Sequence, residues 1–143
     1  MLVTLDILLI LHFVGLMLGA GGGIGSTVVM RHALSLPPEQ GDIIRSTGPA
    51  LATMSIAGLV LMLLSGFSLL AIKYEFALAS MTPMFWIKMV FVTTLTIASV
   101  MIQLTYRDVK RGNTAVAARL PGLGPMAGIS ALLAVLFAVL AFH

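Results

Sequence analysis

Residues 11–26 read LHFVGLMLGAGGGIGS, a run of apolar and small residues whose one ionisable side chain is His12. The run lies inside a longer apolar stretch from about Ile7 to Met30, which is long enough to cross about 30 Å of hydrocarbon as a helix. Three further stretches have the same character, at about 49–72, 83–106 and 125–142. None alternates with the period of two that is typical of membrane strands. We therefore expect an all-α integral membrane protein, a four-helix bundle.

The composition supports this fold class. Of 143 residues, 59% are hydrophobic and 9% are charged, and the mean hydropathy is +1.11, whereas soluble domains have about 45–50% apolar and about 25% charged residues. Water-soluble and disordered classes are excluded. The absence of cysteine excludes disulfides, thiolate metal sites, cysteine-ligated iron–sulfur clusters and cysteine nucleophiles. We expect residues 1–143 to form a single membrane domain.

The connections between the spans predict the orientation in the membrane. The first runs from Arg31 to Gly48 and contains Pro37-Pro38, the second is a short hairpin loop (73–82), and the third (107–124) is basic and broken by Pro121. The first and third hold six basic residues, Arg31, Arg45, Arg107, Lys110, Arg111 and Arg119, against Lys73 and Lys88 on the opposite side. Because cytoplasmic loops carry the excess of Lys and Arg, both termini are expected on the outer, periplasmic side of a bacterial inner (plasma) membrane. The positive charge is thus explained without a nucleic-acid partner.

Prolines are expected to mark the starts of three spans. Pro49, Pro83 and Pro125 each lie near the first residue of an apolar stretch, where the missing N–H of proline costs least. The segment EQGD (39–42) is expected to interrupt the helices, and the TYRDVKR segment (105–111) is expected to form a charged turn at the membrane surface.

Small residues recur along one face of the first span. His12, Gly15, Gly19, Gly22 or Gly23, and Ser26 follow one another every three or four residues and share a helix face. Small residues at this spacing allow two membrane helices to approach closely, which is the structural interpretation. The functional interpretation is that Gly15 and Gly19 leave room for a flat ligand beside His12.

His12 is the strongest candidate for a functional residue. Ionisable groups inside hydrocarbon usually face the bundle and have a partner, so a hydrogen-bonded structural histidine is one interpretation. Neutral imidazole is also the commonest protein ligand of metals, haem iron included, so His12 is a candidate metal ligand. Met54, Met62 and Met89 are candidates for a second axial ligand, as is the His12 of a second copy across a two-fold axis. Five-coordinate iron is the other alternative. Proton transfer by His12 is a third alternative.

Lys88 is expected at the same depth as His12. Each lies five residues after the start of a span that begins on the outer side, and Ser65 and Ser68 fall close to that layer. Lys88 either extends to the interface, as long basic side chains do near helix ends, or pairs with an anionic group such as a propionate or a lipid phosphate.

Several short motifs carry a family resemblance. The LH dipeptide before a glycine-rich first span, the stretch TGPALATMSIAGLVLMLLSGFSLL (47–70) and FWIKM (85–89) resemble the HemJ-type four-helix membrane protoporphyrinogen oxidases and the copper-resistance-D-like membrane proteins. The GxGGGxG start and QLTYRD (103–108) also resemble uncharacterised bacterial integral membrane proteins of unknown function. The first resemblance implies haem b, His12 as its axial ligand, and Lys88 as the lysine of the third span.

Three hypotheses for function follow. The first is a haem b or related porphyrin protein of the inner membrane, redox-active in porphyrinogen oxidation or electron transfer to quinone; if an enzyme, it is a membrane oxidoreductase that acts on a porphyrin. The second is a non-catalytic accessory or scaffold subunit of a larger membrane complex, because the spans hold one histidine and many small residues. The third is a small transporter. The absence of a carboxylate deep in any span counts against it. Besides the lipid bilayer, a second copy of the chain or a larger complex is the expected partner.

Overall fold

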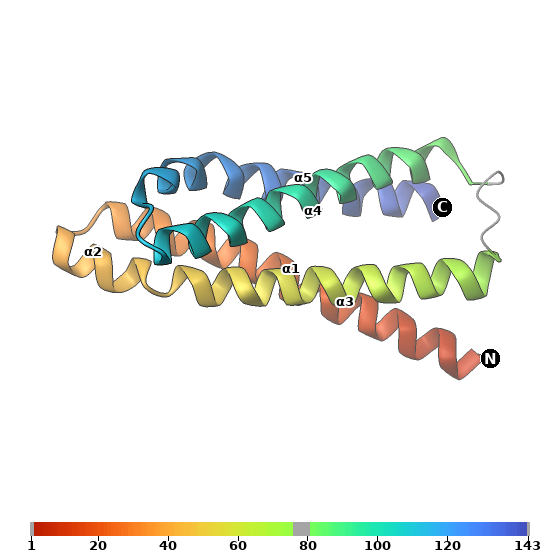
Figure 1. The fold of residues 1–143 in the computed structure, drawn as a ribbon. Coiled ribbons are helices and arrows are strands. Elements are labelled where there is room, and N and C mark those ends of the chain that lie inside the picture. The colour runs from red at the N-terminus through yellow and green to blue at the C-terminus, as the bar shows by residue number, and fades with distance from the viewer. Residues whose placement is uncertain (1, 76–80, 143) are drawn as a thin grey trace.

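The computed structural model describes residues 2–75 and 81–142, and within these ranges every element is a helix. Four helices are long and apolar enough to cross a membrane: α1 (Leu2–Leu34), α3 (Gly48–Tyr74), α4 (Pro83–Lys110) and α5 (Leu120–Phe142). α1 begins and α5 ends at one end of the molecule, which we call the termini end; α3 ends and α4 begins there too (Figure 1). The all-α class is thereby confirmed, and so is the presence of four helices that are long and apolar enough to span a membrane.

The helices extend beyond the predicted spans. α1 starts five residues before Ile7, and α4 continues through Arg107 to Lys110, so the prediction of a surface turn at 105–111 is wrong for most of that segment. An apolar stretch indicates only the part of a helix that could lie in hydrocarbon. The backbone hydrogen bonds of the helix can continue through the flanking residues, since a membrane helix is not obliged to stop where its apolar stretch ends.

The start of the last helix differs from the prediction. α5 begins at Leu120, so Pro121 rather than Pro125 occupies the first turn, and Pro125 lies inside the helix. A proline in the first turn removes an N–H that has no partner there in any case. Pro125 follows one turn later and removes one backbone hydrogen bond, which the helix tolerates this close to its start.

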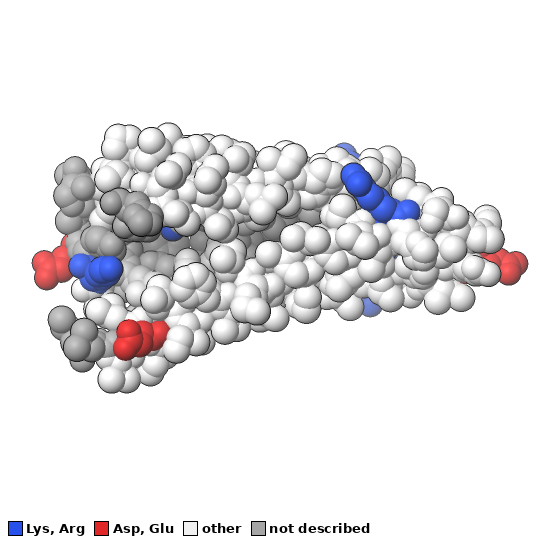
Figure 2. All heavy atoms as spheres, turned by 180° about the vertical axis from the view of Figure 1, so that it is seen from behind, with Lys and Arg blue, Asp and Glu red and all other residues white. Residues whose placement is uncertain are grey.

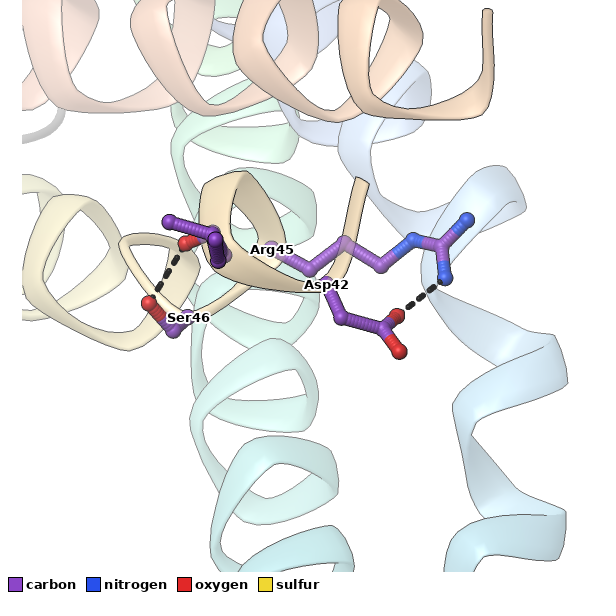
Figure 3. Close-up of polar contacts among 4 residues, drawn as sticks. Asp42, Arg45 and Ser46 are labelled. Carbon is purple, nitrogen blue, oxygen red and sulfur yellow. Dashed lines mark hydrogen bonds and ion pairs between the residues drawn. The ribbon is translucent and has the colours of Figure 1, made fainter. Parts of the chain in front are cut away.

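Two short helices occupy the opposite end, which we call the basic end. α2 (Pro38–Arg45) lies between α1 and α3, and the 3₁₀ helix η2 (Thr114–Arg119) precedes α5. EQGD therefore lies in a helix, contrary to the prediction, because Pro38 at the first position favours helix initiation. An Arg45–Asp42 ion pair of 2.8 Å and a hydrogen bond of 2.6 Å from Ser46 Oγ to the Ile43 carbonyl stabilise its last turn (Figure 3).

The long helices associate as two pairs. α1 packs mainly on α3 and α4 mainly on α5, whereas the two pairs share far fewer contacts with each other. α1 crosses α3 and diverges from it toward the termini end (Figure 1). At the crossing the two backbones touch: a Cβ on Gly22 would lie 2.7 Å from the Ser55 nitrogen, and a Cβ on Gly58 would fall against the Gly19 nitrogen. The glycine face predicted from the sequence is thus a helix–helix contact.

Gly22 and its neighbour Gly21 allow a matched test of this contact. A Cβ on Gly22 would collide with α3, whereas a Cβ on Gly21 would have no atom within 4 Å. We expect Gly22→Ala to lower the free energy of unfolding by about 1–3 kcal/mol, because the helices must separate to admit the methyl group. Gly21→Ala should leave it unchanged or raise it. Unfolding in mixed micelles followed by circular dichroism measures both, and equal effects of the two substitutions would contradict the close approach.

Candidate functional site

A cavity of about 460 Å³ lies between the four long helices near the termini end. α1, α3, α4 and α5 all contribute to its walls, which are apolar except for His12, Lys73 and Lys88. The molecule is visibly hollowed near this end (Figure 2). The cavity exists because α1 diverges from α3 here and because α5 presents small side chains, Ala131, Ala134 and Ala138.

His12 is fixed by two contacts with α3. Its Nδ1 lies 2.9 Å from the Met62 carbonyl oxygen and 3.1 Å from Ser65 Oγ. A carbonyl oxygen can only accept a hydrogen bond, so Nδ1 carries the hydrogen. In a neutral imidazole Nε2 then holds the lone pair. His12 is therefore both the hydrogen-bonded residue of the structural interpretation and a nitrogen donor at a cavity wall.

The α3 backbone makes room for the imidazole at Gly66. A Cβ at this position would lie 3.1 Å from His12 Cε1 and 3.4 Å from Nδ1. Any other residue would therefore crowd the ring. Gly66 was not identified from the sequence; the signal that could have found it is its place directly after Ser65, at the depth of His12.

Lys88 lines the same cavity as His12 and is half-buried. The structure therefore brings together the two residues expected in one layer, and Lys88 faces the bundle. Ser65 contacts His12, whereas the Ser68 hydroxyl bonds to the Leu64 carbonyl of its own helix. Lys73 also borders the cavity, although the sequence indicated only a loop residue.

The candidate methionines separate into two groups. Met62 and Met89 line the cavity, whereas Met54 does not. Met54 is 38% exposed on the outside of α3. The thioethers that could approach a ligand in the cavity are therefore those of Met62 and Met89.

Gly15 and Gly19 border a second, smaller cavity of about 80 Å³. A Cβ on Gly15 would lie 2.7 Å from the Met62 nitrogen, so this glycine packs directly on α3. The two cavities share wall residues such as Leu16 and Leu95. The small cavity is thus next to the large one and lies farther from the termini end.

Among the described residues, no cluster of three or more His, Cys, Asp or Glu side chains could hold a metal ion. A bare zinc ion usually has three or four protein ligands. Iron in a porphyrin differs, because the macrocycle supplies four nitrogens and the protein adds one or two axial ligands. The lone histidine of this cavity suits the second situation.

The coupling between His12 and Ser65 can be measured by a double-mutant cycle. We expect His12→Phe and Ser65→Ala to show an interaction free energy of about 0.5–1.5 kcal/mol, the range of side-chain hydrogen bonds between membrane helices. The matched control is Ser68→Ala, whose hydroxyl bonds within α3 and should show no coupling to His12. Unfolding free energies in mixed micelles give both values. A zero coupling for Ser65 would contradict the contact.

Comparisons with known proteins give no relative for this chain. No family model matches it. No curated protein and no solved structure matches it either. The arrangement of His12, Gly66 and Lys88 around the cavity, with Ser65 in contact with His12, therefore carries the functional argument by itself.

Proposed function

We propose that the chain is a multi-pass protein of the bacterial inner membrane that binds haem b or a related porphyrin in its bundle. His12 would hold the iron of the group, and Lys88 would pair with its carboxylates. One observation carries the proposal: α3 occupies His12 Nδ1, so the lone pair of Nε2 is left for a ligand at the wall of an apolar cavity.

The size and lining of the cavity support a bulky, mostly apolar ligand. Its volume of about 460 Å³ lies within the range of about 300–1,000 Å³ that is typical of cofactor sites. Bundle cores commonly hold such groups between facing helices. At Gly66 and at the alanines of α5 little or no side chain projects into the cavity, which favours a flat ligand.

The charges of the cavity support an anionic edge on that ligand. Lys73 and Lys88 are the basic side chains of the cavity lining, which is otherwise apolar except for His12. Carboxylates such as the propionates of haem would pair with them. Met62 or Met89 would provide a sixth iron ligand, or the iron would remain five-coordinate.

A bound haem would supply one-electron chemistry, in porphyrinogen oxidation or in electron transfer to quinone. The protein's own part is to hold the group by His12, to neutralise its carboxylates by Lys88, and to exclude water with apolar walls. An enzymatic role would make the chain a membrane oxidoreductase that acts on a porphyrin.

An absorption spectrum of the detergent-purified protein, oxidised and dithionite-reduced, tests the proposal. We expect a Soret band with about one haem per chain, or per two chains, by pyridine haemochrome. His12→Ala should lose the band, because the iron loses its protein ligand. His32→Ala is the matched control, since His32 is exposed at the basic end and should leave the spectrum unchanged.

A featureless spectrum after expression with ample haem would overturn the proposal. Stoichiometric co-purification with another membrane complex in mild detergent would then support the accessory-subunit alternative. Substrate-dependent flux in sealed vesicles would support a transporter.

The proposed orientation has both termini on the periplasmic side, supported by the six basic residues at the basic end. Because the sequence contains no cysteine, single-cysteine variants can be labelled without background. We expect a membrane-impermeant maleimide to label Thr82→Cys in intact cells and Asn113→Cys only after lysis; both positions are exposed. Labelling of Asn113→Cys in intact cells, with Thr82→Cys protected, would reverse the orientation.

A further inference from the structure

We infer that three groups of α3 determine which nitrogen of the neutral His12 imidazole carries the hydrogen, so that the hydrogen is on Nδ1 and the lone pair is on Nε2. These groups are the Met62 carbonyl, the Ser65 hydroxyl and the open position at Gly66. They act through His12 and are positioning groups. The inference deepens the proposed function and rests on it only for the identity of the ligand that Nε2 receives.

The Met62 carbonyl determines which nitrogen carries the hydrogen. It lies 2.9 Å from His12 Nδ1 and offers only lone pairs, so the imidazole must donate. This carbonyl belongs to a helix, but its oxygen has two lone pairs and can accept a second hydrogen bond. Backbone geometry thus imposes the tautomer independently of any ligand.

The Ser65 hydroxyl reinforces the same assignment. Ser65 is 3% exposed, and its Oγ donates to the Leu61 carbonyl at 2.7 Å, with the Met62 carbonyl also at 3.1 Å. A hydroxyl that donates its hydrogen to its own helix retains lone pairs. Its contact of 3.1 Å with Nδ1 is therefore one in which the imidazole again donates, and Nδ1–H is shared between two acceptors.

Gly66 sets the position of the ring. Its missing side chain lets the imidazole lie against the α3 backbone, since a Cβ would be 3.1 Å from His12 Cε1. This separation is too short for ordinary van der Waals contact, so a methyl group would displace the ring. The displacement would disturb both hydrogen bonds at Nδ1 and redirect Nε2.

This arrangement is the one that metal-binding histidines use. Their second nitrogen usually donates to a carbonyl or carboxylate, which fixes the tautomer and the ring plane and raises the basicity of the ligating nitrogen. Here both acceptors belong to α3, so Nε2, the nitrogen that would bind a metal, is oriented before any ligand arrives.

The nitrogen-15 NMR spectrum of the protein without haem tests the tautomer directly. Replacement of the two other histidines, His32→Gln and His143→Gln, leaves His12 as the one imidazole. In the neutral imidazole, recorded at a pH where only one nitrogen is protonated, we expect a pyrrole-type signal from a protonated Nδ1 and a pyridine-type signal from Nε2. A neutral imidazole with a protonated Nε2 and a bare Nδ1 would overturn the inference.

Gly66→Ala and Gly128→Ala form a matched pair for the positioning role. A Cβ at Gly128 has no atom within 4 Å, so this substitution controls for the general effect of alanine in a helix. We expect Gly66→Ala to shift the His12 imidazole signals and to weaken haem binding by about tenfold or more, as loss of an outer-shell partner does. Gly128→Ala should change neither. Unshifted imidazole signals in folded Gly66→Ala would contradict the role of Gly66.

The two experiments separate this inference from the proposed function. If the protein shows the expected tautomer but takes up no haem, the inference stands and haem is not the ligand. A normal Soret band in a protein whose free His12 carries its hydrogen on Nε2 would retain haem binding and remove the inference.

Discussion

The direct contact between the α1 and α3 backbones is the constraint on which the rest of the structure depends. Around Gly15, Gly22 and Gly58 no side chain separates the two helices, so their relative position is set by main-chain atoms. One turn from Gly15 toward the termini end, α1 carries His12. One turn from Met62 in the same direction, α3 carries Ser65 and Gly66. The site is therefore positioned by the same crossing that stabilises the pair.

The other wall of the site comes from α4 and α5, which share few contacts with α1 and α3. α4 and α5 pack on each other, and Phe91 and Phe137 stack between them with ring centroids 5.6 Å apart. Facing α1 and α3, this pair presents Lys88 among small and apolar side chains. The cavity thus has three causes. α1 and α3 pack closely on each other, α4 and α5 share few contacts with them, and α5 presents small residues.

The sequence was sufficient for the four spans and for the common depth of His12 and Lys88. Apolar length and helical rise determine both, and neither depends on how the helices pack. It was insufficient for the helix ends, since Pro125 and the 105–111 segment lie where backbone hydrogen bonding rather than hydropathy decides. It was also insufficient for the partners of His12: a backbone carbonyl has no sequence signature, and Gly66 becomes informative only when the imidazole lies against it.

The weak association between the two helix pairs has a consequence for the environment of the protein. Each pair has its own interface, but few contacts hold the pairs together, and large apolar side chains such as Phe13, Phe67 and Val139 are about half exposed at 55%, 53% and 54%. In a bilayer, the lateral pressure of the acyl chains would therefore contribute to the spacing between the pairs. We accordingly expect the volume of the cavity to depend on acyl-chain length and detergent as well as on sequence.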